Sequence, residues 1–303
     1  MARSIPALFY PETAAWRYYF IKLKILCKVE NPQQNYTMVR DKFVSFRDSK
    51  LHYGKTGSGP KHLLIFHGFG QDMGVFDYLT RSLARHYTFY VFDLYFHGKS
   101  HWAHGEQVLT KQEWSDTLRK FLTENNINRF SVAGFSLGGK FALTSLEFFP
   151  DRVDEIFLIA PDGIKTSAWY SLATYPVLLR KFFKSMILHP ERFMRIAESL
   201  NKSGLVDKGL IRFAEYQMNS EEKRHRVYYS WVVFRHLKPD LNTIANAANT
   251  YGIKFTLIVG KFDKVIAPEN MKPFINRLKN IRFEILDSGH TGLINQSIAY
   301  FIT

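Results

Sequence analysis

The chain has 303 residues, 46% of them hydrophobic and 16% aromatic, which supports one large folded domain and argues against intrinsic disorder. Its 41 Lys and Arg against 27 Asp and Glu give a formal net charge of +14, which favours anionic partners. No zinc-finger spacing, Lys/Arg run or RNA-binding signature accompanies this charge, so we expect no nucleic acid partner. The single cysteine, Cys27, excludes an internal disulfide and fits a reducing, cytoplasmic compartment.

Residues 1–41 differ in character from the rest and are predicted to form a basic, aromatic and amphipathic extension. Within it, residues 14–29 are densely apolar, yet on a helical projection Arg17, Lys24 and Lys28 fall close together. The segment is too short and too charged to span a bilayer, and it lacks a signal-peptide cleavage site. Two interpretations remain open. Either its apolar face packs on the main domain, or it contacts an anionic membrane peripherally.

From residue 42 onward, apolar runs alternate with amphipathic helical patterns. Two short runs flanking a polar turn, at 43–46 and 51–54, predict an antiparallel hairpin. The later predicted strands lie at residues 62–66, 89–92, 130–133, 156–160, 255–259 and 281–286. Helical patterns include residues 73–86, 111–125, 267–279 and 292–301. This order predicts an α/β fold with a mostly parallel, roughly eight-stranded sheet covered by helices on both faces.

A turn containing serine joins the strand at 130–133 to the helical pattern that follows it. Its sequence, Gly134-Phe135-Ser136-Leu137-Gly138, is the pattern of a nucleophile elbow, which holds the serine in a strained backbone conformation. The flanking glycines allow strand and helix to cross closely. Alone, the pattern also fits an ordinary turn. It becomes informative only if the chain also supplies an imidazole and a carboxylate to activate the serine.

Both partners follow Ser136 in the chain. Asp263 comes after the strand at 255–259 and His290 after the last strand, which is the order expected of this architecture. Asp162, after the preceding strand, remains the less favoured alternative for the acid. We expect the backbone N–H groups of Leu137 and of Phe69, in the loop at 67–70, to bind an oxyanion. Since carboxyl ends of parallel strands share one edge of a sheet, these residues are expected to converge.

Taken together, these motifs resemble the α/β-hydrolase fold superfamily over about residues 42–301. The matching stretches are His67-Gly68-Phe69-Gly70, Asp93 with His97-Gly98-Lys99-Ser100, the serine pentapeptide with Gly139, Gly260 with Asp263, and Gly289-His290. The resemblance implies that Ser136, Asp263 and His290 act as nucleophile, acid and base. It implies Phe69 and Leu137 as the oxyanion hole, and neither a metal nor an organic cofactor. We interpret Asp93, His97 and Ser100 as bracing their loop, and His67 as shaping the oxyanion loop.

The long segment between the strands at 156–160 and 255–259 exceeds what one crossover needs. It is rich in bulky apolar and aromatic residues, and it resembles the helical cap that this superfamily inserts after the sixth strand. We therefore expect a core of residues 42–161 and 250–303 with a cap at 162–249. Such a cap favours an apolar acyl or aromatic substrate, while its excess of cations would also suit a distal carboxylate or phosphate.

These observations predict a serine hydrolase that cleaves a small ester or thioester through an acyl-enzyme intermediate. Two alternatives remain open. A hydrolase of carbon–carbon bonds in vinylogous diketones uses the same constellation, and a ligand sensor of this fold would show little turnover.

Overall fold

The structure is a computed structural model that describes residues 39–166, 168–203 and 208–302. Residues 14–29, with Cys27, lie outside the described residues, so the packing or membrane contact of this segment stays a prediction. Of the helices that the structure describes, none is both long enough and apolar enough to cross a membrane.

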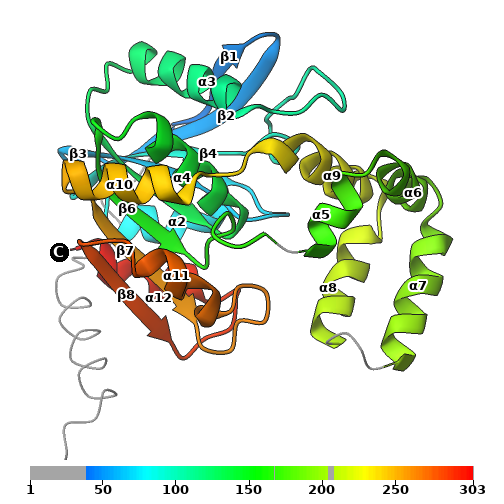
Figure 1. The fold of residues 1–303 in the computed structure, drawn as a ribbon. Helices are drawn as coiled ribbons and strands as arrows, with labels where there is room; N and C mark the ends of the chain where they lie inside the picture. Colours follow the sequence, from blue (N-terminus) through cyan, green and yellow to red (C-terminus); the bar gives the residue numbers. More distant parts are fainter. Residues whose placement is uncertain (1–38, 167, 204–207, 303) are drawn as a thin grey trace, which may run out of the picture.

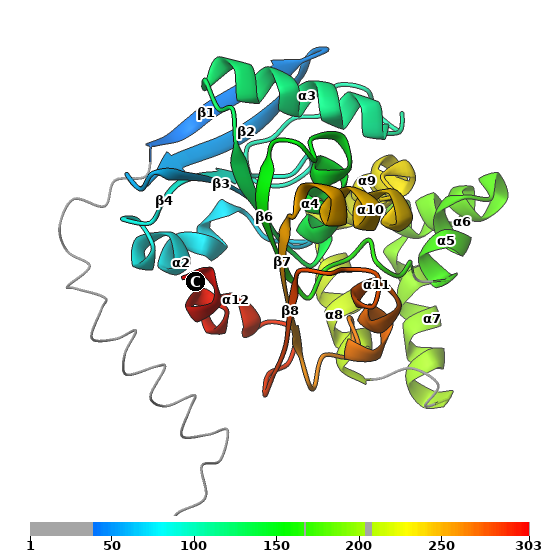
Figure 2. The ribbon, with the colours of Figure 1, turned by 60° about the vertical axis from the view of Figure 1, so that its left-hand side comes forward.

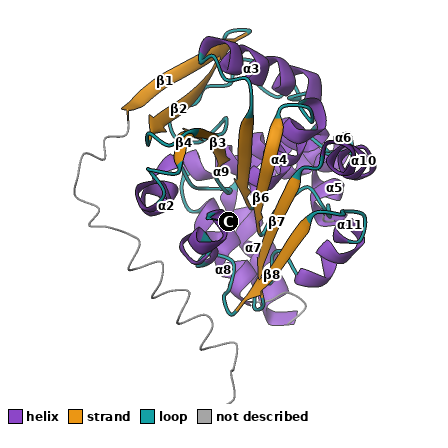
Figure 3. Cartoon of the chain, turned by 90° about the vertical axis from the view of Figure 1, so that its left-hand side faces the viewer, coloured by secondary structure: helices purple, strands orange, loops and turns teal. Residues whose placement is uncertain are grey.

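An eight-stranded sheet forms the centre of the molecule, in the order β1-β2-β4-β3-β5-β6-β7-β8 (Figure 3). The strands are β1 (Val39–Phe46), β2 (Ser49–Thr56), β3 (Lys61–Phe66), β4 (Tyr87–Phe92), β5 (Phe130–Phe135), β6 (Val153–Ile159), β7 (Lys254–Gly260) and β8 (Ile281–Leu286). Strand β2 pairs antiparallel with β1 and β4, and the remaining pairs are parallel. The predicted hairpin and the mostly parallel sheet are therefore confirmed.

Helices cover both faces of this sheet (Figure 2). They are η1 (Met73–Phe76), α2 (Asp77–Ser82), α3 (Lys111–Glu124), α4 (Leu137–Phe148), α10 (Leu241–Tyr251), η3 (Pro268–Met271), α11 (Lys272–Ile275), α12 (Leu293–Gln296) and η4 (Ile298–Phe301). Because side chains alternate along a strand, Leu64 and Phe66 of β3 pack with α3 and α4, whereas Leu63 and Ile65 pack with α2 and α12. A continuous apolar run is thus buried on both faces, as predicted.

Some predicted helices are interrupted. The pattern at 267–279 forms η3 and the short α11, each with a proline in its first turn, Pro268 and Pro273. Proline suits the start of a helix but lacks the N–H that an interior position donates, so the pattern breaks into two pieces. The patterns at 73–86 and 292–301 are likewise split between a 3-10 turn and a short α-helix.

Between β6 and β7 a group of helices stands to one side of the sheet (Figure 1). It consists of α5 (Ala168–Thr174), α6 (Val177–Leu188), α7 (Pro190–Ser203), α8 (Lys208–Met218), α9 (Glu221–Val233) and η2 (Phe234–His236). Helices α5 to α9, called the cap helices below, share a small apolar cluster that includes Phe183, Met218 and Tyr228. Helix α10 instead packs on α4 within the main core. The predicted cap limits of 162–249 stay a proposal.

Replacing Gly138 by alanine should lower the free energy of unfolding by about 2–3 kcal/mol, because the added Cβ would lie 2.0 Å from the Phe66 carbonyl oxygen. Urea denaturation of both proteins measures this difference. Gly289→Ala is the control, since a Cβ there meets nothing within 4 Å, and it should cost less than about 0.5 kcal/mol. Equal costs for the two variants would contradict the close crossing of β3 and α4.

Candidate active site

Ser136 occupies the turn between β5 and α4 with φ 49° and ψ −118°. This left-handed backbone conformation is unfavourable for a residue with a side chain, by about 1–3 kcal/mol, and needs support from its surroundings. The Ser136 N–H donates to the Ile159 carbonyl at 3.0 Å, and the Ser136 carbonyl accepts from the N–H groups of Gly139 and Asp162, both at 2.8 Å. Hydrogen bonds on both sides of the residue therefore hold the turn.

The structure brings Ser136, His290 and Asp263 together from the ends of β5, β8 and β7. His290 Nδ1 lies 2.6 Å from Asp263 Oδ2, and His290 Nε2 lies 3.0 Å from Ser136 Oγ. Because a carboxylate can only accept, Nδ1 carries the proton and donates a hydrogen bond to Asp263. Nε2 is then free to accept the Ser136 hydroxyl proton, which is the arrangement that a serine nucleophile needs.

The Asp263 carboxylate is buried and fully engaged. Its Oδ1 accepts from the backbone N–H groups of Val265 at 2.8 Å and Ile266 at 2.9 Å, while Oδ2 accepts from His290. Burial alone would raise the pKa of this carboxyl, but the hydrogen bonds from His290 and Ile266 outweigh it, so the pKa of Asp263 lies below its ordinary value. Asp263 therefore stays ionised beside the imidazole at neutral pH.

Two other carboxylates that follow strands of the sheet, those of Asp162 and Asp287, pair with lysines. Asp162 Oδ2 pairs at 3.1 Å with Lys140 Nζ, whose side chain is 4% exposed. Asp287 is 81% exposed and pairs with Lys261. Neither carboxylate is the His290 partner in the structure. Sequence reasoning missed Lys140, although a lysine inside the apolar start of the helix after Ser136 was a visible signal.

The loop after β3 carries the candidate oxyanion donor. Its Gly68 N–H donates to Gln71 Oε1 at 3.0 Å, and its Gly70 N–H donates to His97 Nε2, also at 3.0 Å. With both flanking N–H groups engaged, that of Phe69 is the candidate donor from this loop. Leu137 is the first residue of α4, where the N–H groups have no acceptor within the helix.

Two buried histidines hold this loop in place. His67 Nδ1 lies 2.7 Å from the Gly68 carbonyl, and its Nε2 accepts from the Leu94 N–H at 3.0 Å. His97 Nδ1 lies 3.0 Å from the Tyr95 carbonyl. Burial lowers the pKa of both imidazoles, so both are neutral at pH 7 and each holds one donor and one acceptor in place. The interpretation of His67 and His97 as loop-shaping residues is consistent with these contacts.

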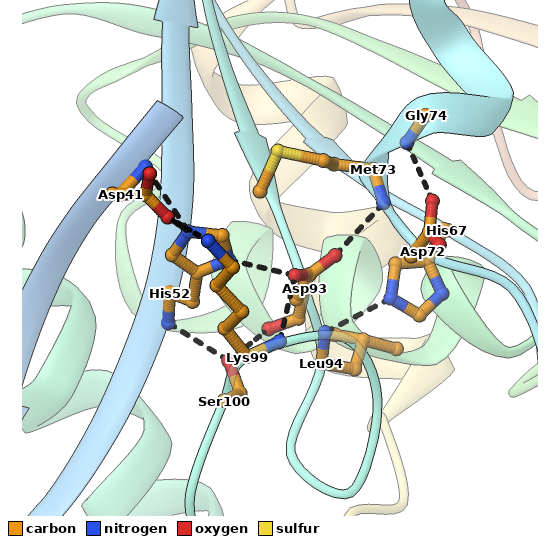
Figure 4. A network of polar contacts seen from close by, with 10 residues as sticks. All are labelled: Asp41, His52, His67, Asp72, Met73, Gly74, Asp93, Leu94, Lys99 and Ser100. Atoms are coloured by element: carbon orange, nitrogen blue, oxygen red, sulfur yellow. Dashed lines mark hydrogen bonds and ion pairs between the residues drawn. The ribbon is translucent and has the colours of Figure 1, made fainter. Parts of the chain in front are cut away.

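Asp93 lies at the centre of the adjoining polar network (Figure 4). Its Oδ1 accepts from the Met73 N–H at 2.8 Å, and its Oδ2 accepts from the Lys99 N–H at 3.1 Å and lies 2.7 Å from His52 Nδ1. The Ser100 hydroxyl donates to the Asp93 carbonyl at 2.7 Å. These contacts confirm the bracing role of Asp93 and Ser100. His52 was not identified from the sequence, because its partner is 41 residues away.

Across residues 39–166, 168–203 and 208–302, no group of three or more His, Cys, Asp or Glu side chains is placed to hold a metal ion.

Comparison with known proteins agrees with this fold. A sequence model of the alpha/beta hydrolase fold family matches residues 61–296, and the chain belongs to that family. Among solved structures, an esterase from Thermogutta terrifontis superimposes with a TM-score of 0.63 at 18% identity, covering 88% of this chain and 96% of the other. An enol-lactonase from Burkholderia xenovorans gives a TM-score of 0.59 at 14% identity, covering 86% and 96%. At such identities these likenesses show the fold alone.

Curated relatives match over shorter stretches. The pimeloyl-[acyl-carrier protein] methyl ester esterase of Nitrosomonas europaea is 28% identical over 123 residues, which is 40% of this chain and 46% of that protein. The protein of the same name from Nitrosospira multiformis is 27% identical over 173 residues, 53% of this chain and 61% of its own length. The match thus spans less than two thirds of either relative.

Asp263 makes a testable contribution to stability. Because its pKa is lower in the folded protein than the ordinary value of 3.8, it stabilises the fold above that pH, and this contribution is lost as the pH falls through the folded pKa. The difference in unfolding free energy between wild type and Asp263→Asn should shrink as the pH falls below about pH 4, where the carboxylate of Asp263 becomes protonated. Asp287→Asn, with its exposed carboxylate, is the matched control and should show no such trend. A difference independent of pH would contradict the hydrogen bonding of Asp263.

Proposed function

We propose that this chain is a serine hydrolase that cleaves an ester or thioester of an apolar acyl or aromatic substrate through an acyl-enzyme intermediate. The observation that carries the proposal is the hydrogen-bonded line from Ser136 Oγ through His290 to Asp263. A hydroxyl, an imidazole and a buried carboxylate in this order form the machinery of nucleophilic acyl transfer. The two curated relatives described above are both named as methyl ester esterases.

In the proposed reaction, Ser136 Oγ attacks the substrate carbonyl while His290 Nε2 takes the hydroxyl proton. His290 then returns this proton to the leaving alcohol or thiol as the bond to the carbonyl carbon breaks, which leaves the acyl group on Ser136. Water attacks the acyl-enzyme, with His290 accepting its proton and passing it to Ser136 as the acid departs. Asp263 keeps Nδ1 protonated and stabilises the transient imidazolium.

The negative charge that forms on the carbonyl oxygen needs preorganised donors. The N–H groups of Phe69 and Leu137 fill this role in the proposal, the first from the loop fixed by His97 and the second from the start of α4. The positive end of the α4 dipole adds to the stabilisation at Leu137.

The apolar part of the substrate would lie under the cap helices. The Phe69 ring packs against the apolar cluster of the cap helices and lies 5.6 Å from His97, measured between ring centroids. Phe96, at the start of the neighbouring loop, stacks on Tyr229 of α9 at 5.7 Å. Aromatic rings thus border the oxyanion loop, which favours an apolar acyl or aromatic group.

Purified wild-type protein should hydrolyse a short p-nitrophenyl acyl ester, and Ser136→Ala should reduce kcat by at least about 10⁴-fold, because no nucleophile remains. Release of p-nitrophenol measures the rate. Ser131→Ala is the matched control: Ser131 lies in β5, the strand that leads to Ser136, and its buried hydroxyl has no hydrogen-bond partner in the part of the chain that the structure describes. Equal activity of wild type and Ser136→Ala would rule out the proposed nucleophile.

Asp263→Asn should lower kcat on the same ester by about 10³- to 10⁴-fold, because the amide no longer holds His290 in the required tautomer. The exposed Asp287→Asn variant should retain the wild-type rate. Vinylogous diketones are assayed in parallel. Turnover of these ketones without turnover of esters would replace the proposal with carbon–carbon bond hydrolysis, and turnover of neither would favour a ligand sensor.

A further inference from the structure

Two polar side chains of the cap helices lie beside the loops after β3 and β4, and each has one buried polar atom with no hydrogen-bond partner among the described residues. The first is Gln217, near the end of α8, which is 6% exposed. Its Oε1 is buried and has no hydrogen-bond partner. The amide sits directly over Gly70, since a Cβ added to that glycine would lie 2.9 Å from Gln217 Nε2. The residue before Gly70 is Phe69, the proposed oxyanion donor.

The second side chain is Arg226 of α9. It lies one helical turn before Tyr229, whose ring stacks on Phe96, so it belongs to the face of α9 turned toward the loop that carries His97. Its Nε is buried and lacks a hydrogen-bond partner. Consistent with this position, the charge of Arg226 adds to burial in lowering the pKa of both His97 and His67.

An unpartnered guanidinium N–H and an unpartnered amide oxygen are costly in a protein interior, and most such groups are satisfied. Here they come from different cap helices, Gln217 over the loop after β3 and Arg226 on the helix face turned toward the loop after β4, and His97 links these two loops beside the proposed oxyanion hole. Groups left open in this way at a substrate site gain their hydrogen bonds when a ligand arrives. The positive charge selects an anionic ligand group, and the planar guanidinium fits a carboxylate best.

We propose that Arg226 and Gln217 form a recognition subsite for a free carboxylate on the substrate, so that the preferred substrate is an ester whose acyl part also carries a carboxylate. The guanidinium of Arg226 donates to the carboxylate. The terminal amide of Gln217 rotates by half a turn, so that its NH₂ group takes the place of Oε1 and also donates to the carboxylate. This inference rests on the proposed ester hydrolysis and adds the class of acyl group.

The test compares mono-p-nitrophenyl esters of dicarboxylic acids, from succinate to suberate, with neutral p-nitrophenyl esters of the same carbon number. The readout is the ratio of kcat/KM for the anionic ester to that for its neutral counterpart. Arg226→Gln should lower this ratio at least about tenfold at the best chain length, because a charge-assisted hydrogen bond in a desolvated site is lost. Gln217→Leu should lower it about threefold or more.

Arg195→Gln is the matched control, since Arg195 is an exposed cation on α7 and the same charge is removed. Its ratio should equal that of wild type. A ratio unchanged in Arg226→Gln, or lowered equally in Arg195→Gln, would overturn the subsite and point to general attraction by the basic cap. Thermal unfolding of each variant separates loss of the fold from loss of recognition.

Measuring ligand binding to a variant that lacks the nucleophile tests the carboxylate subsite independently of ester hydrolysis. In Ser136→Ala, calorimetric titration should show monomethyl adipate binding at least about tenfold more tightly than dimethyl adipate, and adding Arg226→Gln should abolish the preference. If wild type turns over neither ester but this preference holds, ester hydrolysis fails while the carboxylate subsite stands. Equal binding of the two adipates would overturn the subsite even in an active esterase.

Discussion

The strained backbone of Ser136 is the constraint on which the rest of the site depends. Its positive φ turns the hydroxyl out of the sheet, and hydrogen bonds to Ile159, Gly139 and Asp162 hold it there. The same turn starts α4, so it positions the hydroxyl and the Leu137 N–H together. It is possible only because Gly138 lets the helix pass the Phe66 carbonyl at a distance that a Cβ would obstruct. The strained conformation of Ser136 is thus held by its hydrogen bonds to neighbouring segments of the sheet and by the close packing at Gly138.

The three histidines around the candidate site, His67, His97 and His290, have two different physical roles. His67 and His97 are buried and neutral, and they act as fixed hydrogen-bonding links between the loops after β3 and β4. The His290 side chain is 20% exposed, has the ionised Asp263 at one nitrogen and faces the serine with the other. Of these three histidines, His290 alone combines partial exposure with a carboxylate at one ring nitrogen and the serine hydroxyl at the other. The surroundings, rather than the residue type, separate structural imidazoles from the proposed base.

Sequence reasoning located Ser136, Asp263 and His290 because each follows a predicted strand, and the parallel sheet brings those strand ends to one edge. It also predicted the sheet, since short apolar runs such as that ending at Phe66, alternating with amphipathic helical patterns, are expected of strands buried on both faces. It could not find the role of His52. This residue meets Asp93 only because β2 pairs antiparallel with β4, and the sequence does not show that pairing. Nor could it place Gln217 and Arg226, because an amphipathic pattern does not tell which polar side chain of a cap helix turns inward.

The most direct test of the account is mass spectrometry of the protein after reaction with a fluorophosphonate, which modifies only an activated serine. One phosphonyl group per chain is expected on the peptide that contains Ser136, and Asp263→Asn should be labelled much more slowly. Absence of an adduct, or an adduct on another serine, would contradict the assignment of Ser136 as the activated nucleophile.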